Sequence, residues 1–205
     1  VAVKEITDRI SPHDIEFHMV TVNLSGREPA YEQVGNVHVY RVGRGAIGKY
    51  LFPFLGFWKA VQLHKMQAFD ATWSIMANYA GFAALFFKKK FPRVRFILTL
   101  QEGDPIGHIK RHVWWIYPIF LQIFRRADVI QTISTYLKKM AEDMGAKAPI
   151  HVIPNGVDTA LFTQEYPEYE LTALKQKLGK KEGDVFLITT SRLVHKNGID
   201  TVIDA

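Results

Sequence analysis

Two cationic side chains near the end of the chain have the spacing of a phosphate site. Arg192 and Lys196 stand four residues apart in Thr189–Ala205, where a predicted strand is followed by a loop, Gly198 and the start of a predicted helix. A diphosphate would be stabilised there by both cations, by free backbone N–H groups at the helix start and by the helix dipole. A solvated basic turn explains the same pair of residues, and short motifs specify function loosely. The pattern alone leaves both interpretations open.

Polar side chains also follow the most apolar predicted strand, Arg95–Leu100. They are Gln101, Glu102, Asp104 and His108. Glu102 or Asp104 could orient a reacting hydroxyl, or act as its general base, if hydrogen-bond distance is reached. A solvated turn would contain the same residue types, because polar groups are common in loops.

Metal chemistry is not expected. His108 and His112 have the i,i+4 spacing of a metal-binding pair on a helix, but no third ligand is evident. The sequence contains no Asp-x-Asp pair that would hold a metal-bound diphosphate, and it contains no cysteine. The lack of cysteine excludes thiolate chemistry and disulfides and fits a cytoplasmic protein. We therefore expect neither a metal ion nor an organic cofactor.

Composition and charge narrow the class of protein. The 205 residues are 48% hydrophobic and 22% charged, which is typical of a globular protein and not of a disordered one. The formal charge of +6 favours anionic partners. Because the basic residues are scattered and no nucleic-acid-binding module is visible, we do not expect nucleic acid to be the partner. No apolar run reaches the roughly 18 residues needed to span a bilayer.

Strands and helices are predicted to alternate along the chain. Strands are predicted at 16–23, 36–42, 70–74, 95–100, 128–133, 150–153 and 185–190, and helices at 1–10, 48–66 after Pro53, 76–90, 112–125, 134–144 and 168–178. Ser134 is a predicted N-cap, and Gly145 closes the helix that follows it. This order predicts an α/β fold: a Rossmann-like parallel sheet with helices on both faces and right-handed crossovers. Ligands of such sheets bind beyond the carboxyl ends of the strands.

A second short stretch, Pro154–Asp158, is a predicted tight turn that contains Asn155, Gly156 and Asp158. Two motifs then stand in order along the chain: His-Val-Ile-Pro-Asn-Gly-Val-Asp-Thr-x-Leu-Phe from His151, and Ser-Arg-Leu-Val-x-Lys-x-Gly-x-Asp-x-x-Ile-x-Ala from Ser191. Together they strongly resemble the retaining glycosyltransferases of family 4, which have the GT-B fold. The stretch 125–134 also resembles a strand and serine of that family.

The resemblance implies that a sugar is transferred from a nucleoside diphosphate sugar to an acceptor, with retention of anomeric configuration. Arg192 and Lys196 would hold the donor diphosphate and stabilise charge on the departing nucleotide. The family's lysine most often directly precedes the glycine, where this chain has Asn197. Whether Lys196 or Asn197 contacts the diphosphate therefore stays open. On the acceptor side, the resemblance implies that Gln101 and His108 face the acceptor and that Glu102 or Asp104 positions or deprotonates its hydroxyl.

The resemblance also implies how the chain is divided. Residues 1–160 would form the acceptor-side domain without its first strand, 161–182 a linker, and 183–205 the start of the donor-binding domain. Asn155, Gly156 and Asp158 would form the turn between domains. The family's glycine-rich loop would lie before residue 1 and its Glu-x7-Glu motif beyond residue 205. Because both ends also interrupt predicted helices, we expect a piece of a larger enzyme that is inactive alone.

Two aromatic and basic runs, 86–95 and 113–126, are candidates for contact with a membrane that carries a lipid-linked acceptor. Helices packed against a sheet would explain both runs equally. The expected partners are therefore a nucleotide-sugar donor and a saccharide or lipid-linked acceptor, in the cytoplasm or at its membrane face. Two other functions fit the same fold: a non-catalytic nucleotide-sugar-binding module and a sugar-nucleotide epimerase.

Overall fold

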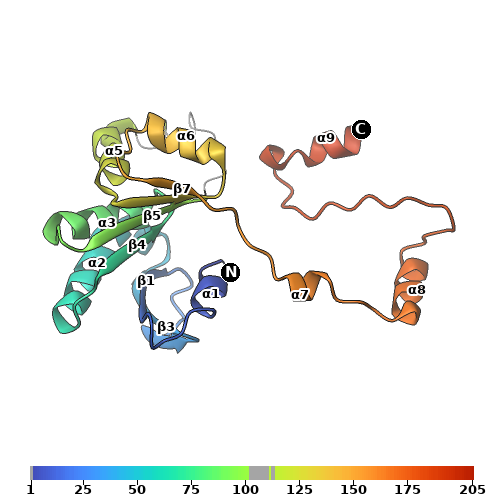
Figure 1. The fold of residues 1–205 in the computed structure, drawn as a ribbon, viewed down its shortest axis with the longest axis horizontal. Coiled ribbons are helices and arrows are strands. Elements are labelled where there is room, and N and C mark those ends of the chain that lie inside the picture. Colours follow the sequence, from blue (N-terminus) through green and yellow to red (C-terminus); the bar gives the residue numbers. More distant parts are fainter. Residues whose placement is uncertain (1, 102–110, 112–113) are drawn as a thin grey trace. The chain divides into compact units, whose positions relative to one another are not determined.

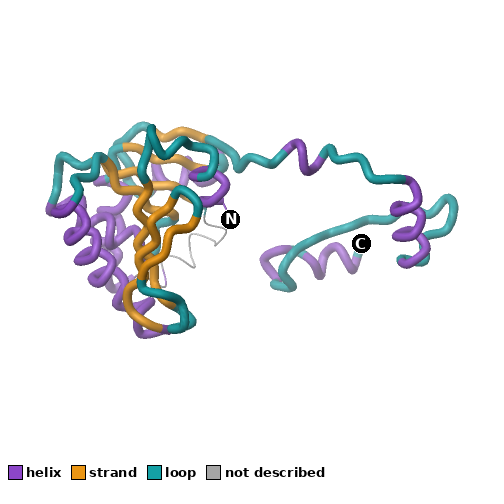
Figure 2. Tube along the Cα trace, turned by 90° about the horizontal axis from the view of Figure 1, so that it is seen from below, coloured by secondary structure: helices purple, strands orange, loops and turns teal. Residues whose placement is uncertain are grey.

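The computed structural model describes residues 2–101, 111 and 114–205. The chain divides into two compact units, Val1–Gly156 and Val157–Ala205, hereafter unit 1 and unit 2. Figures 1 and 2 show the elements of both units.

Unit 1 contains two sheets (Figure 1). In the first, called sheet A, β1 (Phe17–Asn23) pairs in parallel with β3 (Val37–Arg44), and β2 (Tyr31–Val34) pairs antiparallel with β3. In the second, called sheet B, all neighbours are parallel in the order β4 (Ala71–Ile75), β5 (Arg95–Leu100), β6 (Val129–Thr132) and β7 (Ile150–Val152). The predicted α/β class with a parallel sheet is confirmed, but β2 was not predicted.

The helices of unit 1 flank these sheets. They are α1 (Ala2–Thr7), α2 (Gly45–Met66), α3 (Tyr79–Lys90), the 3-10 turn η1 (Trp114–Ile116), α5 (Tyr117–Arg126) and α6 (Thr135–Asp143). The predicted cap of α6 is confirmed, because the Ser134 hydroxyl accepts the backbone N–H of Leu137 at 3.3 Å. Gly145 follows α6 at φ +83°, the left-handed conformation that commonly ends a helix. No helix in the described residues is both long and apolar enough to cross a bilayer.

The start of α2 differs from the prediction. The sequence placed the helix after Pro53, whereas α2 begins at Gly45 and contains Pro53. Proline lacks the backbone N–H that would bond to the preceding turn, which disfavours an interior position. Tertiary packing outweighs this cost, because Phe52, Val61 and Leu63 are buried where α2 packs on β1, β3 and α3.

The main core lies between sheet B and three helices. Alternate residues of the strands supply one side of it, and α3, α5 and α6 supply the other; its fully buried side chains include Leu85, Phe96, Leu98, Leu100, Phe120, Ile123, Phe124, Ile130 and Met140. In the run 113–126, Phe120, Ile123 and Phe124 of α5 belong to the core, as the alternative interpretation predicted, whereas Trp114 and Trp115 are 74% and 69% exposed. A smaller cluster of Val61, Phe87 and Val94 connects α2 to α3.

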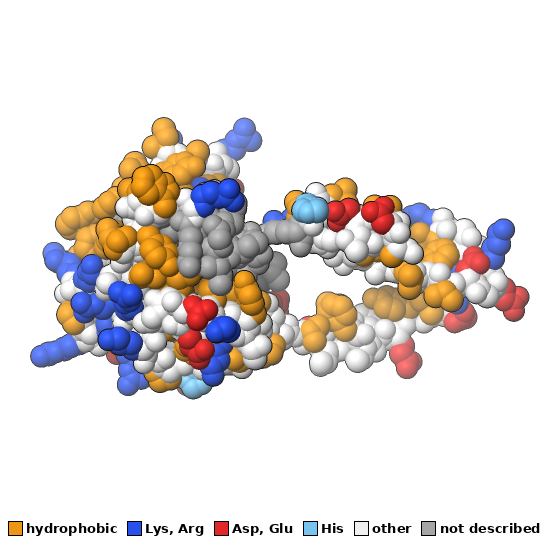
Figure 3. Space-filling model, turned by 90° about the horizontal axis from the view of Figure 1, so that it is seen from above, with side chains coloured by type: hydrophobic (Ala, Val, Ile, Leu, Met, Phe, Trp, Pro, Cys, Tyr) orange, Lys and Arg blue, Asp and Glu red, His pale blue; other side chains and the backbone are white. Residues whose placement is uncertain are grey.

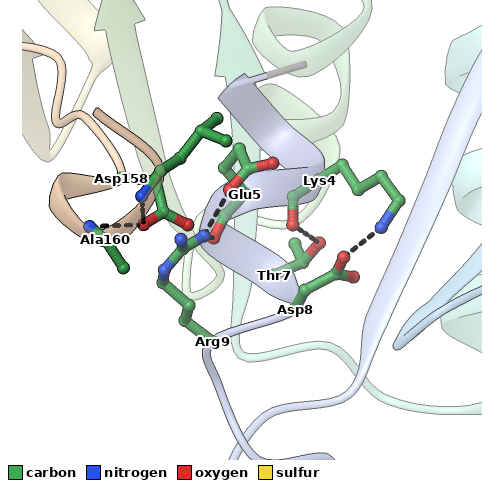
Figure 4. Close-up of polar contacts among 8 residues, drawn as sticks. Lys4, Glu5, Thr7, Asp8, Arg9, Asp158 and Ala160 are labelled. Atoms are coloured by element: carbon green, nitrogen blue, oxygen red, sulfur yellow. Dashed lines mark hydrogen bonds and ion pairs between the residues drawn. The ribbon is translucent and has the colours of Figure 1, made fainter. Parts of the chain in front are cut away.

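The N-terminal helix α1 is short and largely exposed. Figure 4 shows its i,i+4 pairs, Lys4 with Asp8 and Glu5 with Arg9, on the helix surface. Such exposed pairs stabilise a helix by only about 0.2–0.5 kcal/mol each. A firmer contact comes from Asn36, whose side-chain amide donates to the carbonyl of Ile10 at 2.8 Å. The turn between β2 and β3 thus holds the segment that follows α1.

Unit 2 contains α7 (Thr159–Phe162), α8 (Glu168–Lys177), the 3-10 turn η2 (His195–Asn197) and α9 (Ile199–Asp204). The predicted strand at 185–190 is wrong: these residues form coil, and Figure 2 shows them within a long loop segment. Val185, Leu187 and Ile188 are at least 80% exposed. A strand requires a hydrogen-bonded neighbour, and the described part of unit 2 contains no strand to pair with.

Candidate active site

The carboxyl edge of sheet B is where the fold favours ligand binding. Met76 follows β4, Gln101 follows β5, Ser134 lies just beyond β6 and Ile153 follows β7. Parallel register brings these positions to one edge of the sheet. The edge is therefore the candidate acceptor side of the site.

Gln101 is the one predicted acceptor-side residue that the structure describes, and it is half-buried directly after β5. Glu102, Asp104 and His108 lie outside the described residues, so their proposed roles remain predictions. Beneath Gln101, the hydroxyl of buried Thr99 accepts the indole N–H of Trp73 at 2.9 Å. This bond ties β4 to β5 near the edge that carries the candidate residues.

Met76 is a feature of this edge that the sequence did not indicate. Its φ is +69°, and it is the only described non-glycine residue with positive φ. Its backbone N–H donates to the carbonyl of Thr99 at 2.7 Å, and its carbonyl accepts the hydroxyl of Ser74 at 3.2 Å. Residues held in such sparsely populated conformations concentrate at functional sites. No local signal could have shown this, because Ile75-Met76-Ala77 contains neither glycine nor asparagine.

The predicted donor-side residues lie in the loop 191–198 of unit 2. The side-chain amide of Asn197 donates to the hydroxyl of Ser191 at 2.7 Å and to the carbonyl of Arg192 at 3.1 Å. Gly198 follows at φ +65°, a conformation that glycine adopts without strain. Asn197 therefore closes the loop onto its own backbone. Arg192 is exposed, with no ion pair among the described residues.

A further contact within this loop joins His195 to α9. The His195 Nδ1 lies 2.8 Å from the Asp200 carboxylate, and the imidazole is almost fully exposed. Such an exposed pair adds little stability. It nevertheless shows that two side chains, those of His195 and Asn197, organise the loop that carries the two candidate cations.

The predicted tight turn at Pro154–Asp158 is wrong in its geometry. These residues are exposed and form no hydrogen-bonded turn in the described backbone, and Gly156 does not adopt positive φ. The division between units falls directly after Gly156. Asp158 instead caps α7 by accepting the N–H groups of Ala160 and Leu161 at 3.1 and 3.3 Å; Figure 4 shows the bond from Ala160. Asparagine and glycine here indicated a break in structure, not a turn type.

A hollow on unit 1 lies away from these residues. Its lining includes Asp70, Ala71, Arg93 and Arg95, which stand at the amino ends of β4 and β5. Ligands of parallel α/β sheets bind at the opposite, carboxyl edge. The hollow is therefore not a candidate for the substrate site.

Fold comparison matches the chain to a solved structure of the GT-B fold. A sucrose-phosphate synthase from Thermosynechococcus elongatus superposes with a TM-score of 0.59, covering 86% of this chain and 93% of that one at 12% identity. The family model described as Glycosyltransferase Family 4 matches residues 1–161. The chain thus belongs to glycosyltransferase family 4, as the two motifs indicated.

Two curated relatives have similar sequences. One is the GDP-mannose-dependent monoacylated alpha-(1-6)-phosphatidylinositol monomannoside mannosyltransferase of Corynebacterium glutamicum, 29% identical over 114 residues, which are 53% of this chain. The other is the alpha-monoglucosyldiacylglycerol synthase of Streptococcus pneumoniae, 25% identical over 162 residues, which are 75% of this chain. The matched regions span only 28% and 36% of those two proteins.

Proposed function

We propose that the protein transfers a sugar from a nucleoside diphosphate sugar to an acceptor hydroxyl, with retention of anomeric configuration. The observation that carries this proposal is the family match over residues 1–161. The printed name of the relative from C. glutamicum, which specifies GDP-mannose, supports a nucleoside diphosphate donor.

Arg192 and Lys196 are the residues proposed to bind the donor diphosphate. Because both amide hydrogen bonds of Asn197 stay inside the loop, Asn197 is better suited to shape this site than to contact phosphate. A guanidinium can bind phosphate oxygens in bidentate fashion and would offset the negative charge that develops on the leaving nucleotide. On the acceptor side, Glu102 or Asp104 is proposed to position or deprotonate the acceptor hydroxyl, with Gln101 and His108 beside it.

Arg192 and Lys196 are themselves cations and could neutralise the diphosphate directly. Carboxylates would instead need a bound metal ion to do so. We therefore propose that no cofactor takes part in transfer and that added Mg²⁺ or Mn²⁺ leaves the initial rate unchanged. A rate that depends on either ion would contradict this assignment.

The acceptor is proposed to be a glycolipid or other lipid-linked molecule, because the names of both relatives specify lipid substrates or products. A membrane-facing surface on unit 1 supports this. Helix α2 contains no Asp or Glu and exposes Ile47, Tyr50, Leu51, Phe54 and Trp58, hereafter the α2 stripe, at 47–75% of their surface. Figure 3 shows one face of unit 1 on which hydrophobic side chains lie among Lys and Arg, with a few Asp and Glu. Apolar and basic surface together suits an anionic bilayer, with the enzyme held peripherally at the cytoplasmic face.

Donor turnover by the complete protein tests the proposed reaction. We expect one nucleoside diphosphate sugar of a panel to release its nucleotide, and Arg192→Ala to lower that rate by about 100-fold, the usual effect of losing one charge-stabilising group. Lys177→Ala, which removes an exposed cation from α8 of the same unit, is the matched control and should leave the rate unchanged. Proton NMR of the product should show the anomeric configuration of the donor. Release of nucleotide from none of the donors would contradict a transferase.

A further inference from the structure

Three side chains that bind metals well lie together at the amino ends of β1 and β3. Glu16 immediately precedes β1, His18 lies in β1, and His38 in β3 is its register partner. Residues two apart on a strand share a face, and partners on adjacent parallel strands point to the same side. The sheet itself therefore brings the carboxylate and both imidazoles to one face.

The three donor atoms are close to coordinating distance. Glu16 Oε1 lies 2.7 Å from His18 Nε2 and 3.7 Å from His38 Nε2, and one donor atom from each residue lies within 4.8 Å of the others. The two imidazole rings are stacked, with centroids 4.9 Å apart and planes 17° from parallel. Zinc bonds of about 2.0–2.2 Å to nitrogen and oxygen would require only small side-chain movements from this arrangement.

A second layer of hydrogen bonds orients two of the three donors. Tyr31 Oη lies 2.9 Å from His38 Nδ1, which leaves the His38 Nε2 to face Glu16. The Gln67 side-chain amide donates to Glu16 Oε2 at 2.7 Å, which leaves Oε1 to face the imidazoles. This bond, with a smaller effect of His18, holds the pKa of the Glu16 carboxyl below its usual range. Partners of this kind are the normal support of metal-binding histidines and carboxylates.

The packing around His18 leaves only one of its two ring nitrogens available to bind a ligand. Its side chain is only 9% exposed, and its ring packs against Phe69 and Tyr40 at 5.1 and 5.9 Å between centroids. Its Nδ1 is buried and has no hydrogen-bond partner among the described residues. His18 therefore acts through Nε2 alone, the atom that faces Glu16. Glu16 is half-exposed, so solvent and ions can reach the cluster.

We propose that Glu16, His18 and His38 form a binding site for a divalent transition metal of the zinc type. Two imidazoles and one carboxylate with an open fourth position are a common zinc ligand set, whereas Mg²⁺ and Ca²⁺ prefer oxygen ligands alone. The site joins β1 to β3, and the hydrogen bond from Gln67, the residue that follows α2, connects it to that helix. It stands at the amino ends of the strands of sheet A, whereas the candidate acceptor residues follow the carboxyl ends of sheet B. None of the three ligands is a residue proposed for sugar transfer, so the proposal is independent of the proposed transferase function.

Zinc titration of the chelator-treated full chain tests this site. We expect one saturable Zn²⁺ per chain and an increase in Tm with zinc concentration, because a ligand that binds only the folded state stabilises it. Glu16→Gln keeps the size and part of the hydrogen bonding of a half-exposed residue, and should weaken zinc binding about 100-fold. Tyr31→Phe removes only the partner of His38 and should weaken it about tenfold. His13→Ala, which removes an exposed histidine three residues before the site, should have no effect.

Co²⁺ in place of zinc provides a second measurement. Its visible absorption should show nitrogen and oxygen coordination in the unmodified chain and lose that signal in Glu16→Gln, while far-UV circular dichroism confirms that the variant is folded. Absence of saturable binding, or equal binding to Glu16→Gln and the unmodified chain, would overturn the proposal. The three residues would then form a carboxylate–imidazole hydrogen-bond cluster only.

Discussion

Asp128 and Lys88 join three elements at the amino edge of sheet B. The Asp128 carboxylate accepts the backbone N–H of Phe96 at 2.6 Å and lies 2.7 Å from the Lys88 ammonium. Lys88, at the end of α3, also donates to the carbonyls of Pro92 and Val94, and its side chain is only 13% exposed. Hydrogen bonds to charged groups are the stronger ones, and partial burial reduces their screening by water. This pair therefore contributes more to stability than the exposed pairs of α1.

Replacement of Asp128 by alanine should lower the free energy of unfolding by about 2 kcal/mol, because it leaves a largely buried ammonium without its counter-charge and a strand N–H without its acceptor. Asp128→Asn retains a neutral acceptor for the Phe96 N–H and should cost less. Asp143→Ala is the matched control, since the Asp143 pair with Lys139 on α6 is exposed and 3.6 Å apart. It should change stability by about 0.5 kcal/mol or less. Urea denaturation measures all three, and an Asp128→Ala midpoint equal to that of Asp143→Ala would refute the role given to this pair.

The partners of Asp128 explain why its role could not be read from the sequence. The stretch 125–134 contributed to the family resemblance, but nothing local indicates that Asp128 meets Phe96, 32 residues away, or Lys88 at the end of α3. Local capping was predictable, as Ser134 and Gly145 show, because the partners of a cap lie within one helical turn. Met76 could not be predicted for the same reason, since its positive φ is stabilised by contact with Thr99 of the neighbouring strand.

At the scale of elements, the junction of β3 and α2 depends on a close approach of two glycines. A Cβ added to Gly48 would lie 2.9 Å from the carbonyl carbon of Gly43 and 3.2 Å from a methyl group of Val22. Gly48 lies within the helix, where alanine is favoured over glycine by about 1 kcal/mol. Helix propensity would make Gly48→Ala stabilising, whereas the close approach to Gly43 would make it destabilising. The sign of the measured change in stability therefore shows which effect dominates.

We expect Gly48→Ala to be destabilising by about 1–2 kcal/mol, because the contact is with backbone that can move only if β3 and α2 separate. Gly156→Ala is the control: a Cβ there meets nothing within 4 Å, and its backbone conformation is open to other residues. Thermal unfolding followed by circular dichroism gives both values. An increase in Tm for Gly48→Ala would mean that helix propensity, and not the close approach, controls this position.

Helices and strands were predictable where the pattern of their own residues specifies them. They were not predictable where pairing with another strand decides whether they form. The strands β5 and β6 alternate apolar residues that are fully buried, such as Leu98 and Ile130, and both were predicted. The exposed strand β2 has no such pattern, because its pairing with β3 alone defines it. The coil at 185–190 is the converse case, with a strong strand pattern and no partner strand in unit 2. The proposed sites follow the same rule, because the proposed phosphate motif was suggested by resemblance whereas the proposed metal cluster depends on the register of His18 with His38.

At the scale of the whole molecule, the α2 stripe is a large apolar surface that the described residues leave exposed. Its members recur at three- and four-residue intervals on the side of α2 opposite Phe52 and Leu63. Helix α2 is therefore apolar on the face that meets the core and on a second face that does not. Contiguous apolar surface of this kind marks an interaction site on a protein. Lys65, on the same side of α2 as the stripe, and the lack of any Asp or Glu in this helix favour an anionic membrane over an acidic or neutral protein surface.

Binding of the full chain to phospholipid vesicles tests this surface. The bound fraction should rise with phosphatidylglycerol content and fall with salt, because each lysine near an anionic surface contributes about 1 kcal/mol and salt screens it. The double variant Phe54→Ser/Trp58→Ser removes two exposed rings from the α2 stripe and should weaken binding at least about tenfold, since burying each ring is worth roughly 1.5–3 kcal/mol. Tyr136→Ser, which removes a comparably exposed ring from α6, is the control and should leave binding unchanged. If the double variant and the control bind vesicles equally well, the stripe does not contact the membrane, and the proposed lipid-linked acceptor loses the support of this surface.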